Sequence, residues 1–277
     1  MAANELTTNP SEPRRLAGLA ADDYGESDDR RPLVLLHGLT FDRSMWRPAL
    51  DELRRIDPGR RALALDLPDH GESAPLPSYA MEEVVDVVHQ AVEEAQLESP
   101  VIVGHSVSGI IATIYATRHT TSGVVNVDQT LQTAQFGEFA RSIEDKLRGP
   151  EFPAVWEMFL ASMHIELLPP SAQELVRSTC DPRQDLVLGY WNEILKRPAA
   201  ELAAATETGH AVLRAAGRPY LIVAGDEPEP DYRRWLNDTL PQATFIAWPG
   251  SGHFPHLAHP DLFAECLATT AQWPVSS

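Results

Sequence analysis

The fold is decided by one short stretch, Val101-Ile102-Val103-Gly104-His105-Ser106-Val107-Ser108-Gly109. Its first three residues are apolar and β-branched, which indicates a buried strand. The small residues that follow are typical of a sharp turn, because a close backbone approach to neighbouring loops leaves no room for large side chains. Residues 110–118, with small side chains along one side, then predict a helix. A strand, a turn and a helix in this order would lift the Ser106 hydroxyl above the edge of a sheet.

Further short apolar runs occur on both sides of this stretch and alternate with helical patterns. The apolar runs lie at residues 33–36, 62–65, 124–127, 220–223 and 244–248, and helical spacing occurs at 81–96, 232–240 and 260–273. Continuous apolar runs predict strands covered on both faces, and their alternation with helices predicts parallel β-α-β units. With an opening hairpin expected at 14–26, we predict an α/β fold: a doubly wound, mostly parallel eight-stranded sheet flanked by helices.

The strand pattern stops between residues 129 and 212, where helical segments replace it. These segments are predicted at 136–147, 153–163, 172–178 and 186–195, separated by glycine, proline and Asp-Pro. We interpret 129–212 as a helical cap, or lid, inserted into a core formed by 13–128 and 213–277. Residues 1–12 are polar and show no periodicity, so we expect a flexible tail there.

The composition limits the classes of function. Of the 277 residues 43% are hydrophobic, which suffices for a full core, and 40 acidic against 22 basic residues give a formal net charge of -18. This negative potential repels nucleic acids and anionic lipid surfaces, so we expect a small-molecule substrate and neither nucleic acid nor membrane as partner. The sequence leaves the oligomeric state open.

The cysteines and the apolar segments bear on location and cofactors. Cys180 and Cys266 are too few for a disulfide framework and lack metal-ligand spacing. The first thirty residues contain no apolar signal segment, and no run of about 18 apolar residues occurs. We therefore expect a cytoplasmic protein that needs neither a metal nor another cofactor.

Four motifs in chain order resemble those of the α/β-hydrolase family, over roughly residues 30 to 275. They are His37-Gly38 after the first long apolar run, the loop from Asp66 to Ser73, the turn at Ser106, and Gly250-Ser251-Gly252-His253 before the last predicted helix. The second of them resembles the family's D-x-P-G-x-G-x-S loop. The turn departs from the pattern G-x-S-x-G in one respect, because Ser108 stands at the second glycine position and Gly109 follows it.

The resemblance implies roles for four residues. Ser106 is the nucleophile and His253 the general base, because a serine hydroxyl attacks at neutral pH only when an imidazole takes its proton. The backbone N–H groups of Leu39 and Val107 are expected to hold the oxyanion that develops on the substrate.

The acid of the triad has two candidate positions. Most relatives carry it after the strand that follows the cap, in a pattern like G-x-x-D, but Gly225-Asp226-Glu227-Pro228 puts proline there. Some relatives place the acid at the end of the strand after the nucleophile helix, where this chain has Asp128. Both strands open on the same edge of a parallel sheet, so Asp128 could reach the imidazole. We favour Asp128, with helix capping as its alternative role, over the later acidic residues Asp226, Glu227 and Asp231.

Three functions are compatible with these motifs. The leading hypothesis is hydrolysis of a small apolar or aromatic ester, lactone or thioester through an acyl-enzyme. The alternatives are a cofactor-independent dioxygenase or lyase that uses His253 and Asp128, and a catalytically silent ligand-binding protein. The cap supplies large apolar residues that are first of all core residues, although some should face a cleft over the strand ends: Trp156, Met158, Phe159, Met163, Tyr190 and Trp191.

Overall fold

One eight-stranded sheet organises the chain, of which the computed structural model describes residues 14–274. The strands are β1 (Arg14–Leu16), β2 (Leu19–Tyr24), β3 (Leu33–Leu36), β4 (Ala62–Leu65), β5 (Val101–His105), β6 (Gly123–Val127), β7 (Tyr220–Ala224) and β8 (Ala243–Ala247). They lie in the order β1-β2-β4-β3-β5-β6-β7-β8. β2 pairs antiparallel with β1 and with β4, and the remaining neighbours are parallel. The predicted fold class and hairpin are confirmed, while the expected tail at 1–12 lies outside the described residues.

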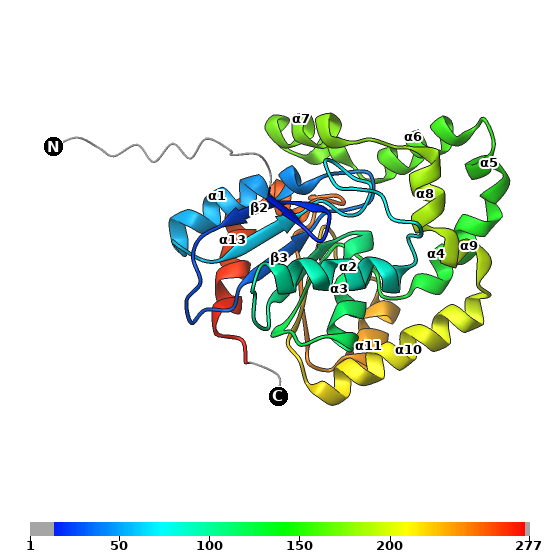
Figure 1. The fold of residues 1–277 in the computed structure, drawn as a ribbon. Helices are drawn as coiled ribbons and strands as arrows, with labels where there is room; N and C mark the ends of the chain where they lie inside the picture. Colours follow the sequence, from blue (N-terminus) through cyan, green and yellow to red (C-terminus); the bar gives the residue numbers. More distant parts are fainter. Residues whose placement is uncertain (1–13, 275–277) are drawn as a thin grey trace.

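Helices cover both faces of this sheet (Figure 1). They are α1 (Arg47–Ile56), α2 (Met81–Glu94), α3 (Val107–Arg118), α11 (Pro230–Thr239), α12 (Pro255–Ala258) and α13 (Pro260–Thr269). Successive residues of a strand point to opposite faces, so each apolar run serves two cores. Leu33 and Leu35 pack in the core that contains α1 and α13, whereas Val34 and Leu36 pack in the core with α2 and α3. This two-sided burial explains why the strands read as continuous apolar runs.

The chain between β6 and β7 is helical. It forms α4 (Thr133–Ser142), α5 (Glu144–Arg148), α6 (Phe152–Ser162), α7 (Pro170–Thr179), α8 (Gln184–Tyr190), α9 (Asn192–Lys196) and α10 (Ala199–Ala216). Two predicted segments are divided, at Ile143 and at Trp191. α10 was not predicted, and the expected boundary at residue 212 falls inside it. Figure 1 shows α4, α5, α6, α8 and α9 gathered on one side of the molecule. Within residues 14–274, each helix is too short or too polar to cross a membrane.

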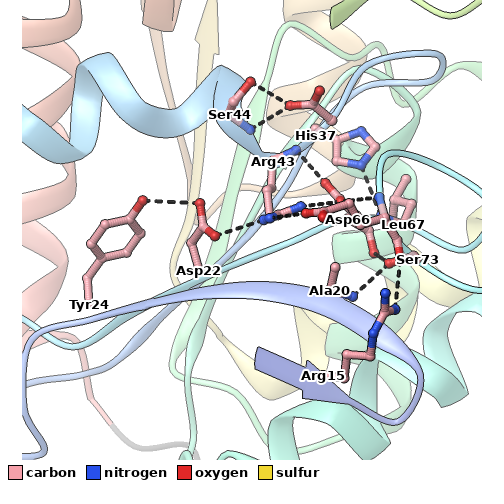
Figure 2. Close-up of polar contacts among 12 residues, drawn as sticks. Arg15, Ala20, Asp22, Tyr24, His37, Arg43, Ser44, Asp66, Leu67 and Ser73 are labelled. Carbon is pink, nitrogen blue, oxygen red and sulfur yellow. Dashed lines mark hydrogen bonds and ion pairs between the residues drawn. The ribbon is translucent and has the colours of Figure 1, made fainter. Parts of the chain in front are cut away.

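A buried carboxylate holds the loop that follows β4 (Figure 2). Asp66 is fully buried. It accepts hydrogen bonds from the backbone N–H of Arg43 at 2.7 Å and of Glu72 at 2.9 Å, and it pairs with the Arg43 guanidinium. Gly71, at φ +50°, is required here, because a Cβ atom would lie 2.2 Å from Asp66 Oδ2. The loops after β3 and β4 are thereby tied together next to the carboxyl edge of the sheet.

We predict that Asp66→Ala lowers the free energy of unfolding by about 3 kcal/mol, because it leaves the backbone N–H groups of Arg43 and Glu72 without their acceptor and removes the buried one of the carboxylates that pair with the Arg43 guanidinium. Urea denaturation checks this value. Asp51→Ala is the matched control, since Asp51 is exposed and, among the described residues, pairs only with Arg54 one turn away; it should change stability by less than about 0.5 kcal/mol. Equal stability of the two variants would contradict the structural role of Asp66.

Candidate active site

Ser106 lies in the tight turn between β5 and α3. Its backbone has φ 55° and ψ −130°, a conformation that costs free energy for any residue with a side chain. The turn leaves no space beside β5: a Cβ atom on Gly104 would lie 2.0 Å from the carbonyl oxygen of Ser108. Glycine is therefore needed at position 104 for the chain to reverse and begin α3 directly after Ser106.

The departure from the G-x-S-x-G pattern has a local explanation. Ser108 is fully buried, and its hydroxyl donates a 2.5 Å hydrogen bond to the backbone carbonyl of His37. Its polar group is thus satisfied, and it joins the turn to the loop after β3. The position that must be glycine is 109, because its backbone packs closely against Asn126 and a Cβ atom there would lie 2.6 Å from Asn126 Oδ1. The serine and the following glycine together serve the packing of the turn.

Asp128 lies directly after β6 and contacts the imidazole of His253. Its Oδ2 accepts from His253 Nδ1 at 2.6 Å, and its Oδ1 accepts from the backbone N–H of Gly225 at 2.9 Å. Burial alone would raise the pKa of Asp128, but these hydrogen bonds hold the pKa below its ordinary value. The carboxylate is therefore ionised at neutral pH. It fixes the proton of His253 on Nδ1 and leaves Nε2 as the basic nitrogen.

The backbone of His253 is held from two further sides. Its N–H donates to the carbonyl of Met163 at 2.9 Å, and its carbonyl accepts from His105 Nε2 at 2.8 Å. His105 is fully buried. Burial is the main cause that holds its pKa well below 6.5, and the neighbouring His256 and His253 lower the pKa further. It is therefore a neutral donor at this point. The loop of His253 is fixed both to the turn of Ser106 and to the segment that follows α6.

One cavity of about 960 Å³ is lined by Ser106, Asp128 and His253, and also by Leu39 and Val107. The Ser106 hydroxyl forms no hydrogen bond with another residue of the described range. The hydrogen bond between a nucleophile and its base often forms fully only when substrate is bound. Among residues 14–274 the backbone N–H groups of Leu39 and Val107 also have no acceptor. Leu39 and Val107 thus line the same cavity as Ser106, with N–H groups for which no other residue of the described range is an acceptor.

Aromatic residues from the segment between β6 and β7 line the cavity. Of the cap residues expected from the sequence, all except Met158 line the cavity, and Met158 is 48% exposed. Sequence reasoning missed Phe136 and Phe139, although their spacing of three residues on one helix is a recognisable signal. It also missed the contribution of α10, because that helix was not predicted. The wall is suited to an apolar or aromatic ligand.

The later acidic residues take other positions. Asp226 is exposed and lines the cavity, whereas Glu227 and Asp231 pair with Arg233 and Arg234. The structure thus brings Asp128 to His253, whereas Asp226, Glu227 and Asp231 remain exposed.

Comparisons with known proteins agree with this architecture. A model of the alpha/beta hydrolase family matches residues 33–266. The chain is 26% identical over 261 residues to pimeloyl-[acyl-carrier protein] methyl ester esterase of Yersinia enterocolitica, which spans 87% of this chain and 93% of that protein.

Two solved structures show the same fold at low sequence identity. A thermophilic esterase from Thermogutta terrifontis has a TM-score of 0.73 and 21% identity over 95% of this chain and 100% of its own. A protein that recognises and cleaves the ring of the Pseudomonas quinolone signal has a TM-score of 0.73 and 16% identity over 94% of this chain and 98% of its own. At such identities the likeness concerns the fold alone.

We predict that Gly104→Ala lowers the free energy of unfolding by about 3 kcal/mol, because the new methyl group collides with backbone that cannot move without displacing α3. Gly209→Ala is the control. It replaces a helical glycine whose Cβ would meet only Thr117 Cγ2 at 3.7 Å, and it should stabilise by about 0.5 to 1 kcal/mol. Thermal or urea unfolding measures both. An unaltered stability of Gly104→Ala would show that the turn is not as tight as described.

Proposed function

We propose that this chain, which belongs to the α/β hydrolase family, hydrolyses carboxylic esters through Ser106, His253 and Asp128. The observation that carries the proposal is the 2.6 Å hydrogen bond between His253 Nδ1 and Asp128 Oδ2, beside a cavity that Ser106 also lines. The esterase among its relatives supports ester hydrolysis. The aromatic wall of the cavity favours an apolar or aromatic ester, lactone or thioester as substrate.

In the first half of the reaction, Ser106 Oγ attacks the carbonyl carbon while its proton passes to His253 Nε2. The carbonyl oxygen becomes an oxyanion, which accepts hydrogen bonds from the N–H groups of Leu39 and Val107. The ionised Asp128 stabilises the imidazolium. The bond to the leaving alcohol then breaks, the alcohol takes the proton from His253, and an acyl ester remains on Ser106.

In the second half, water replaces the alcohol. His253 takes a proton from the water as it attacks the acyl carbon, and the same N–H groups hold the second oxyanion. Breakage of the ester bond returns the proton to Ser106 and releases the carboxylic acid. Enzyme and base end as they began, so the reaction consumes ester and water alone.

The helical segment 129–212 acts as the cap of this site in the proposal, over a core of 13–128 and 213–277. Its aromatic residues line the cavity, and the carbonyl of Met163 holds the His253 backbone. A cap in this position would shield the acyl-enzyme and select the substrate by shape.

We predict that a fluorophosphonate labels the protein at Ser106, and that Ser106→Ala abolishes both labelling and turnover of aryl esters. Mass spectrometry of the labelled peptide identifies the modified residue. Ser142→Ala is the control, because Ser142 is exposed and, within residues 14–274, its hydroxyl bonds only to the carbonyl of Phe139 in the same helix; this variant should be labelled and turn over esters as the wild-type chain does. Persistent turnover in folded Ser106→Ala would refute the proposed nucleophile.

We predict that Asp128→Asn lowers kcat for an aryl ester by about 10³- to 10⁴-fold, because the amide no longer fixes the imidazole tautomer or stabilises the imidazolium. Asp226→Asn should lower it by less than threefold, since that carboxylate is exposed. Steady-state kinetics on both variants decides between them. The opposite order of effects would move the acid to the loop after β7.

The same pair of His253 and Asp128 also suits deprotonation of an aromatic substrate, which is the dioxygenase or lyase alternative. Oxygen uptake and carbon monoxide release with hydroxyquinolone-type substrates, compared with aryl ester turnover, separate the two reactions. Tight ligand binding without turnover, unaffected by Ser106→Ala, would favour a catalytically silent binding protein.

A further inference from the structure

The cavity continues well beyond the three residues of the proposed triad. On α3 its lining includes Val107, Ile110, Ile114 and Thr117, which are three or four residues apart and share one face of the helix. A helix rises about 1.5 Å per residue, so this face extends about 15 Å from the turn of Ser106. The cavity therefore has an arm that starts at the proposed nucleophile and runs along α3.

The opposite side of this arm is formed by α10, whose lining residues include the small Ala205 and Gly209 among larger ones such as Leu202 and Val212. Ala205 and Gly209, one helical turn apart, both line the cavity. A Cβ atom added to Gly209 would meet Thr117 Cγ2 at 3.7 Å, so α10 lies beside the second half of α3. A leucine side chain at either position would project beyond this van der Waals contact into the cavity that both residues line.

The threonines on the α3 side of the arm use their hydroxyl donors within the described part of the chain, as Thr208 on the α10 side does toward the carbonyl of Ala204. The hydroxyl of Thr113 donates to the carbonyl of Gly109, and that of Thr117 to the carbonyl of Ile114. With their donors used within α3, these residues leave an arm suited to an apolar chain next to Ile110 and Ile114.

The far end of the arm is charged. Arg118, the last residue of α3, lines the cavity and pairs with Asp86 at 2.8 Å and with Glu82 at 3.3 Å. An apolar chain gains nothing by extending past this ion-paired end. The arm thus has a defined usable length between Ser106 and Arg118.

We propose that the arm between α3 and α10 binds the acyl chain of the substrate, and that it accepts straight acyl chains of up to about 13 carbon atoms, since an extended chain advances about 1.2 Å per single bond. The inference rests on the proposed ester hydrolysis and names the substrate class of that site. The acyl part is assigned to the arm because the arm begins at the serine that would carry the acyl group.

Gly209→Leu tests this assignment by filling the arm, with kcat/KM measured for methyl decanoate and methyl butanoate. The ratio of the two values should fall by about tenfold, the loss expected when two methylene groups are excluded from an apolar site. Ala203→Leu is the matched control, because Ala203 lies on the exposed side of α10 and outside the cavity lining. It should leave the ratio within twofold. A thermal melt shows whether Gly209→Leu is folded. If it is not, Ala205→Leu is used for the same test.

A second ester tests whether the arm binds the acyl chain or the alcohol chain of the substrate. Decyl acetate has the same long chain on the alcohol side, and Gly209→Leu should affect it much less than methyl decanoate. An equal loss for both esters, or a decanoate-to-butanoate ratio unaffected in folded Gly209→Leu and Ala205→Leu, would overturn the assignment.

A binding measurement keeps this test independent of the proposed chemistry. In a Ser106→Ala background, methyl decanoate is titrated while the fluorescence of the cavity residues Trp156 and Trp191 is followed. Adding Gly209→Leu should weaken binding about tenfold, whereas adding Ala203→Leu should not. If Gly209→Leu weakens decanoate binding but the protein without substitutions turns over no ester, the proposed hydrolysis is refuted and the arm is retained. If the protein turns over short esters but Gly209→Leu leaves decanoate binding unaltered, the arm is refuted and the hydrolysis is retained.

Discussion

The structure depends on the parallel hydrogen-bond ladder that joins β5, β6 and β7. The N–H of Ser106 donates to the carbonyl of Val127 at 2.9 Å, and the N–H of Asp128 donates to the carbonyl of Val223 at 2.8 Å. These bonds place the ends of three neighbouring strands at one edge of the sheet. Ser106, Asp128 and the loop at Gly225 consequently meet, although they are far apart in the sequence.

The pairing of Asp128 with His253 converts this edge into a site with a defined protonation pattern. Hydrogen bonds from His253 and Gly225 outweigh the effect of burial and keep the pKa of Asp128 low. The backbone of His253 is held in addition by His105 from the core and by Met163 from the segment after α6. The position of His253 is thus set jointly by Asp128 at the sheet edge, by His105 at the end of β5 and by the segment between β6 and β7.

Sequence reasoning succeeded where local patterns carry the information. The strands were recognisable because both faces are buried, and Asp128 could be proposed for the site because the ends of parallel strands share one edge. α10 was missed because its first half is rich in alanine, which has high helix propensity but little hydrophobic contrast. Two features could not be predicted from a local pattern, because each is formed by segments distant in sequence. They are the contact of Met163 with His253 and the arm beside Gly209. The departure at Ser108 became intelligible only through its hydrogen bond to the His37 carbonyl.

The most direct test of the account is a crystal structure of the protein after reaction with an alkyl phosphonate. The account predicts phosphorus bonded to Ser106 Oγ and a phosphoryl oxygen about 2.7 to 3.1 Å from the N–H groups of both Leu39 and Val107. The hydrogen bond between His253 Nδ1 and Asp128 should persist in the adduct. An adduct on another residue, or a phosphoryl oxygen directed away from both N–H groups, would contradict it.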